Sequence, residues 1–139
     1  MSRIAWIIIG LLVLLGVLAG GAAGGYALLM RHKIGLNLAQ GEAALANGEW
    51  KKAKNHLAWY LTQRPDDVAV LMKYAEASLQ LVDNRRMAVS DAGRAYFQVA
   101  KYAPDDPANQ ARVLEFYFQH RLWGDLAYVA EWFLRRSAE

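Results

Sequence analysis

An uncharged apolar run near the N-terminus is the feature that most constrains how this chain can fold. Residues 4 to 30 contain no charged side chain, and they are preceded by Arg3 and followed by Arg31, His32 and Lys33. A helix needs about 20 apolar residues to cross a hydrocarbon core about 30 Å thick. The run is 27 residues long, so it predicts one transmembrane helix followed by a zone of different composition.

The ends of this run carry side chains suited to a membrane interface. Trp6 and Tyr26 lie 20 residues apart, which is about 30 Å along a helix, so both rings could sit at opposite membrane surfaces. Arg31 and Lys33 would then mark the exit from the membrane. A cleaved signal peptide is the alternative, because the small residues at 19 to 23 resemble a cleavage site, but the apolar run is too long for one.

Small residues recur at helical spacing inside the predicted span. Gly16, Gly20 and Gly24 repeat every four residues, and Ala19 and Ala23 form a neighbouring row. Such a face lets a second helix approach closely, which is a main source of helix association in lipid. The alternative is that Gly and Ala are simply frequent in membrane helices.

The charge balance supports the same division of the chain. The formal net charge of +3 equals the contribution of Arg3, Arg31 and Lys33, so the remainder is balanced and predicts no nucleic-acid surface. The absence of Cys excludes disulfides and thiolate metal sites.

The positive charges flanking the run are nearly equal, which leaves the topology open. A short basic N-terminus resembles an uncleaved signal anchor, which favours a single-pass protein of a bacterial inner membrane with its soluble domain in the periplasm.

The zone after Lys33 predicts helices throughout. Its apolar residues recur at helical spacing, Pro is confined to Pro65, Pro104 and Pro107, and no alternating strand pattern occurs. The tetrapeptides Arg-Pro-Asp-Asp and Ala-Pro-Asp-Asp close two similar units. We therefore predict an all-α fold with a transmembrane anchor and its flanks at 1 to 33 and a repeat domain at 34 to 139. The predicted repeats are 34 to 67, 68 to 106 and 107 to 139.

The first unit carries a recognisable set of small, aromatic and apolar positions. These positions are Gly41, Gly48, Trp50, Ala53, Leu57 and Pro65. Their spacing resembles the tetratricopeptide repeat, in which a first helix with a small residue is followed by a Gly-x-aromatic turn and a second helix. The resemblance implies a right-handed stack of about three antiparallel helix pairs, with a groove that binds peptide or protein segments.

The later units match this pattern less closely. The second has Ala75, Ala92, Tyr96 and Pro104 at corresponding positions, but Asp83-Asn84 replaces the Gly-x-aromatic turn. The third has a looser register, and we expect its turn at 124 to 126, where the sequence reads Gly-Asp-Leu.

One three-residue pattern recurs in the first helix of each predicted pair. Its members are Leu38, Glu42 and Leu45, then Met72, Glu76 and Leu79, then Ala111, Glu115 and Phe118. The tetratricopeptide resemblance implies that these positions lie near the concave groove, where a row of carboxylates would favour Lys, Arg or amide groups. The alternative is that Glu simply favours exposed helical positions.

No pattern points to catalysis or to a cofactor. The three His residues have no partner at metal-binding helical spacing, and no nucleophile, phosphate-loop or dinucleotide motif occurs. Large aromatic residues exceed what small hairpins can bury, so some should face a partner or a membrane surface, among Trp50, Trp59, Trp123, Tyr128 and Trp132.

We therefore expect a non-enzymatic, membrane-anchored scaffold or assembly subunit of a membrane complex. It would bind protein subunits through the groove and the small-residue face, would contact the lipid bilayer, and would need no cofactor. A structural homo-oligomer and a chaperone-like periplasmic holdase are the alternatives.

Overall fold

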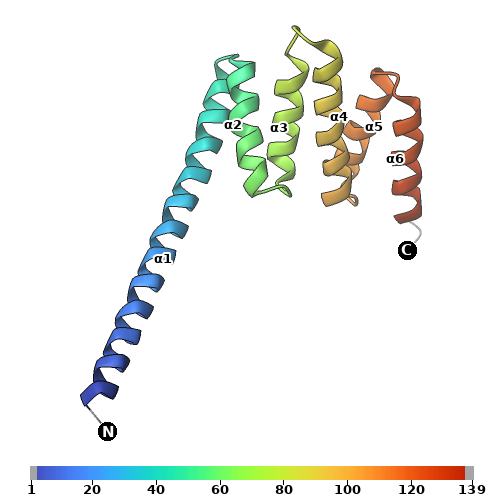
Figure 1. Cartoon of the computed structure of the whole chain (residues 1–139). Coiled ribbons are helices and arrows are strands. Elements are labelled where there is room, and N and C mark those ends of the chain that lie inside the picture. Colours follow the sequence, from blue (N-terminus) through green and yellow to red (C-terminus); the bar gives the residue numbers. More distant parts are fainter. Residues whose placement is uncertain (1–2, 137–139) are drawn as a thin grey trace. The chain divides into compact units, whose positions relative to one another are not determined.

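The computed structural model describes the backbone of residues 3 to 136 and the side chains of residues 25 to 136. This part of the chain contains six helices and no strand (Figure 1), which confirms the predicted all-α fold. The helices are α1 (Arg3–Ala46), α2 (Trp50–Gln63), α3 (Val68–Leu79), α4 (Arg85–Tyr102), α5 (Pro107–Gln119) and α6 (Trp123–Arg136).

The chain divides into two compact units. The first comprises Met1–Leu36 and the second comprises Asn37–Glu139. The boundary falls inside α1, which continues through Gly35 without a break. Gly35 therefore does not end this helix.

The predicted location in a bacterial inner membrane requires correction. Among the described residues, no helix is long and apolar enough to cross a membrane, and this finding contradicts the predicted single-pass topology and periplasmic domain. The described side chains of α1 begin at Gly25, only six residues before the polar group Arg31, His32 and Lys33. The rest of the predicted span, residues 4 to 24, lies outside the described side chains.

The repeated Pro-Asp-Asp sequence has a clear structural role. Its second aspartate is the N-cap of the following helix in both copies, because Asp67 accepts a hydrogen bond from the Val70 backbone N–H and Asp106 accepts one from Ala108. Asn84 caps α4 in the same way. Capping satisfies backbone donors that would otherwise lack partners, so these residues define where three of the helices begin.

The last turn of the helical unit lies earlier than the sequence suggested. The connection between α5 and α6 is His120 to Leu122, so Gly124 lies inside the first turn of α6 and the predicted turn at 124 to 126 is wrong. Arg121 adopts a left-handed conformation with φ 56°, and the Leu122 N–H donates to the Tyr117 carbonyl. A left-handed conformation at a residue other than glycine is uncommon. The sequence therefore has no glycine at this position that would have indicated the turn.

Two hydrophobic clusters hold the second unit together, and α3 contributes to both. The smaller cluster contains Ala44, Ala53 and Ala77, with Leu45 packed against it. The larger cluster joins α3, α4, α5 and α6, and its buried members are Leu71, Ala75, Ala92, Ala95, Val99, Ala100, Val113, Phe116, Tyr117, Val129 and Phe133. Since consecutive helices share these clusters, no helix pair buries its apolar face alone.

Candidate functional site

A groove lies between α3 and α5. It consists of hollows of about 640 Å³ and about 330 Å³ that share Met72, Glu76 and Arg112 in their walls. We call it the α3–α5 groove. Its complete lining is Val68, Ala69, Met72, Lys73, Glu76, Leu79, Gln80, Tyr96, Ala103, Asp106, Asn109 and Arg112.

The helical period explains why these side chains meet. Val68, Met72, Glu76 and Leu79 follow one another at intervals of four, four and three residues, so α3 presents them on one face. Val68, Met72 and Leu79 also pack against the larger hydrophobic cluster, whereas Glu76 is exposed. The groove therefore has an apolar wall that is anchored in the core and a carboxylate that is open to solvent.

The polar groups of the groove offer both a donor and an acceptor. Glu76 supplies a carboxylate from α3, and Arg112 supplies a guanidinium from α5. Tyr96 lies half-buried in the same wall, and burial raises the pKa of its hydroxyl, while Arg112 lowers it and Glu76 raises it. The Tyr96 ring stacks on Phe116 with their centroids 4.6 Å apart, which holds it in place.

The structure brings together one of the three residue sets predicted from the sequence. Met72, Glu76 and Leu79 all line the α3–α5 groove. Ala111 and Glu115 are exposed outside its lining, and Glu115 accepts a hydrogen bond of 2.9 Å from Gln119. Phe118 is also outside the groove.

The N-terminal set lies apart from this groove. Leu38 is half-buried, and Leu45 packs against the small alanine cluster. Glu42 forms an ion pair with Lys73, which itself lines the groove. Cations therefore accompany two of the three predicted carboxylates, since Arg112 lies in the same hollows as Glu76.

The predicted membrane residues fall largely outside the described side chains. This holds for Trp6 and for the small-residue face formed by Gly16, Ala19, Gly20, Ala23 and Gly24. Tyr26, Arg31 and Lys33 are described and exposed. Their predicted role at a membrane interface depended on the span and loses its support with it.

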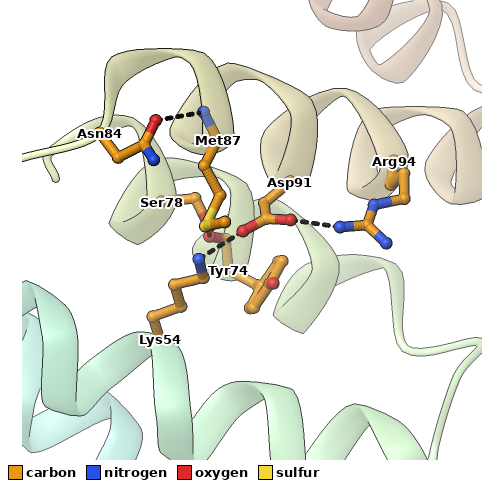
Figure 2. Close-up of polar contacts among 7 residues, drawn as sticks. All are labelled: Lys54, Tyr74, Ser78, Asn84, Met87, Asp91 and Arg94. Carbon is orange, nitrogen blue, oxygen red and sulfur yellow. Dashed lines mark hydrogen bonds and ion pairs between the residues drawn. The ribbon is translucent and has the colours of Figure 1, made fainter.

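A polar cluster that the sequence did not reveal joins α2 to α4 (Figure 2). Asp91 is 7 % exposed, and it accepts a hydrogen bond of 2.5 Å from the Lys54 ammonium and another from Arg94. The Lys54 nitrogen also lies 6.0 Å from the centroid of the Tyr74 ring. Burial alone would raise the pKa of Asp91, but the bonds from Lys54 and Arg94 outweigh it and leave the pKa lowered.

This cluster stabilises the helix packing and lies outside the groove. Lys51 and Lys52, which precede Lys54 on α2, are exposed, whereas Lys54 is half-buried. Its partner is 37 residues away in the sequence. No local pattern could have paired the two residues.

Arg112 was also absent from the predicted site. It immediately follows Ala111, the predicted groove position, and of these two residues only Arg112 lines the groove. Tyr96 had been noted as a repeat position but not as a groove residue. A rotation of α5 by about 100° is enough to exchange neighbouring residues at a helix surface, and sequence spacing alone does not determine it.

Comparisons with known proteins add no family assignment. No model of a protein family matches the chain, and no curated protein matches it. The tetratricopeptide resemblance therefore stays a prediction. Within the described part of the chain, no group of three or more His, Cys, Asp or Glu residues could hold a metal ion.

Proposed function

We propose that this protein is a non-enzymatic scaffold that holds an extended segment of a partner protein in the α3–α5 groove. The observation that carries the proposal is the composition of that groove. An apolar wall containing Met72 and Leu79 lies beside groups of opposite charge, Glu76 and Arg112. The sequence predicted a row of carboxylates alone, which would favour Lys, Arg or amide groups of the bound segment.

A peptide in extended conformation suits these groups. Its backbone presents N–H donors and C=O acceptors, which can pair with Glu76 and Arg112 respectively. The α3 helix has 12 residues, or about 18 Å at the helical rise, which matches about five residues of an extended chain. Apolar side chains of that peptide would contact Met72 and Leu79.

Self-association is a second candidate function, favoured by the surface of α6. Trp123, Tyr128 and Trp132 are exposed on this helix, which ends the described stack of helices. Exposed large aromatic residues are enriched at protein interfaces. Light scattering of the full chain in a non-ionic detergent distinguishes this candidate, because self-association predicts a discrete oligomer that Trp132→Ser dissociates.

Site-specific photocrosslinking tests the groove directly. A photoreactive phenylalanine analogue is placed at Met72 or, as a control, at Phe118, and the full chain is irradiated in cells that normally make it. We expect peptides of one partner protein to be joined to position 72 and not to position 118. Equal crosslinking at both positions, or none at position 72, would overturn the proposal.

A matched pair of charge reversals sharpens this test. Glu76→Lys changes a groove carboxylate, whereas Glu115→Lys makes the same change on α5 outside the groove. Both side chains are exposed, so neither change should unfold the protein. We expect Glu76→Lys to abolish the crosslink at position 72 and Glu115→Lys to preserve it. The reverse outcome would overturn the proposal, whereas loss of the crosslink in both variants would support the carboxylate row expected from the sequence.

A further inference from the structure

Another hollow, of about 890 Å³, lies between α4 and the connection from α5 to α6. We call it the arginine cleft. Its lining is Arg85, Arg86, Val89, Ser90, Gly93, Arg94, Phe97, Gln98, Tyr117, His120, Leu122 and Asp125. None of these residues lines the α3–α5 groove, so the cleft is a separate surface of the molecule.

One face of α4 forms the long wall of the arginine cleft. Its lining residues come in neighbouring pairs at 85 and 86, 89 and 90, 93 and 94, and 97 and 98, which is one pair per helical turn. This wall extends about 20 Å at the helical rise of about 1.5 Å per residue. Val89 and the partly exposed Phe97 give it an apolar component, so the cleft is an elongated strip.

Positive charge in the cleft exceeds negative charge. The lining contains the guanidinium groups of Arg85, Arg86 and Arg94 and one carboxylate, that of Asp125. Arg94 is already bonded to Asp91. In the described residues, neither Arg85 nor Arg86 forms an ion pair. At least two guanidinium groups are therefore available to an external anion.

The position of these two arginines makes an anion more favourable still. They are the first two residues of α4, and the first turn of this helix contains no acidic side chain. Cations at a helix N-terminus oppose the helix dipole, so a bound anion would relieve that unfavourable interaction. Burial, assisted by Arg85, lowers the pKa of His120, which keeps this neighbour neutral at neutral pH.

The other wall of the cleft is closed by groups that already have partners. The Tyr117 hydroxyl donates a buried hydrogen bond of 2.9 Å to the Gly93 carbonyl. Burial, together with Asp125, raises the pKa of Tyr117 to about 12, so it stays protonated. Ser90 and Gln98 remain as neutral polar groups along the α4 wall.

From this arrangement we infer that the arginine cleft binds an acidic, extended peptide segment that also carries an aromatic or aliphatic side chain. The carboxylates would pair with Arg85, Arg86 and Arg94, and the apolar side chain would contact Val89 and Phe97. Peptide length fits the strip, since about six extended residues span about 20 Å. The inference is independent of the function proposed for the α3–α5 groove.

The geometry favours a peptide over other anions. One phosphate group bound at Arg85 and Arg86 would leave the apolar side chains of Val89 and Phe97, further along the same strip, without a ligand. A flat bilayer surface fits a hollow poorly. A nucleic acid would need an excess of basic residues across the domain, whereas the residues after Lys33 carry equal numbers of acidic and basic side chains.

Fluorescence anisotropy with a defined probe tests the inference. The probe is a fluorescein-labelled peptide of sequence Glu-Glu-Phe-Glu-Glu-Leu, titrated with the full chain in a non-ionic detergent at low salt. We expect saturable binding that Arg85→Gln/Arg86→Gln weakens by at least about tenfold, because charged hydrogen bonds to the probe's carboxylates would be lost. The matched control is Lys51→Gln/Lys52→Gln, which removes the same charge from exposed positions at the start of α2.

Several outcomes would overturn the inference. Equal weakening by the arginine and lysine variants would show that the probe responds only to the net charge of the protein. Equal binding of a probe with Gln in place of Glu would show that the cleft does not recognise carboxylates. Failure of the acidic probe to bind would also count against it, as would binding of phosphatidylglycerol vesicles through the arginines in place of the peptide. Arg112→Gln must leave probe binding unchanged, because loss there would assign the probe to the α3–α5 groove.

Discussion

The two hydrophobic clusters of the helical unit are built from side chains of different size. The cluster shared by α1, α2 and α3 consists of Ala44, Ala53 and Ala77, and beside it Gly41 faces Leu57 so closely that an added Cβ would lie 2.7 Å from a Leu57 methyl carbon. The cluster shared by α3 to α6 contains large side chains. The small residues of the first cluster let its helices approach closely. In the second cluster, aromatic rings fill the space between the helices.

This difference predicts that the two clusters fail in opposite ways. Where helices are held close by small residues, adding a methyl group should be costly because a buried side chain would have to shift. Where rings fill the space, removing a ring should be costly because it leaves a cavity. The Lys54–Asp91 ion pair runs between helices that contribute to different clusters, so it links the two kinds of packing.

The largest expected effect is that of Phe116→Ala in the ring-filled cluster. Phe116 is 4 % exposed, stacks on Tyr96 and contacts the edge of Tyr117. Its loss should lower the free energy of unfolding by about 3 to 5 kcal/mol, measured by urea denaturation of the full chain. The control Phe118→Ala, at a side chain 60 % exposed, should cost no more than about 0.5 kcal/mol. Equal losses would mean that the ring cluster does not pack as described.

Asp91→Asn should have the next largest effect, because it weakens the link between the clusters. The substitution removes the charge that Lys54 and Arg94 bind and should cost about 1.5 to 3 kcal/mol. Since the folded-state pKa is lowered, this stabilisation is present above the ordinary aspartate pKa of 3.8 and is lost as pH falls through the folded-state value.

Urea titrations at neutral and acidic pH measure both parts of this prediction. The difference between the native protein and Asp91→Asn should shrink on acidification. As a control, Glu131→Gln breaks an exposed pair with Arg135 and should change stability by less than about 1 kcal/mol. A difference that stays constant with pH would show that the Asp91 charge does not contribute.

Gly41→Ala tests the close approach in the small-residue cluster. The new methyl group would be 2.7 Å from one Leu57 carbon and 3.0 Å from another, and Leu57 is completely buried. We expect a loss of about 1 to 3 kcal/mol, reduced in part by the better helix propensity of alanine. Gly124→Ala is the control, since a Cβ there would meet nothing within 4 Å. A stabilised Gly41→Ala protein would refute the close contact.

The same substitution in the ring-filled cluster should have the smallest effect and the opposite sign. A Cβ at Gly93 would lie 3.5 Å from Phe116, an ordinary contact, and the Gly93 carbonyl would still accept its bond from Tyr117. Gly93→Ala should therefore raise the free energy of unfolding by about 0.5 to 1 kcal/mol through helix propensity. A loss in the same denaturation assay would mean that this cluster is also tightly closed around its glycine.

Local sequence signals located most of the helices because capping and turn residues act on their own neighbours. Asp67, Asn84 and Asp106 begin three helices through bonds to backbone groups no more than three residues away. The turn within the third predicted repeat was misplaced because its left-handed residue is Arg121, whose side chain does not favour a turn. Gly124, which suggested the turn, lies within α6.

The candidate site was predictable only where one helix presents it. Met72, Glu76 and Leu79 share a face of α3, so their spacing was enough to place them together. Arg112 lines the groove because of the orientation of α5 about its axis. The arginine cleft is formed by residues of α4 together with residues of the connection after α5. These contacts depend on how several helices pack against one another.

The amino-acid sequence by itself determined the helical class, the capped helix starts and the apolar face of each helix, because these depend on interactions within a few residues. Only the tertiary structure decided that Lys54 pairs with Asp91, that Arg112 lines the same groove as Glu76 and that Arg85 and Arg86 line a hollow. The reason is geometric. Helix rotation and close approach are set by side-chain volumes in the shared clusters, which come from residues far apart along the chain.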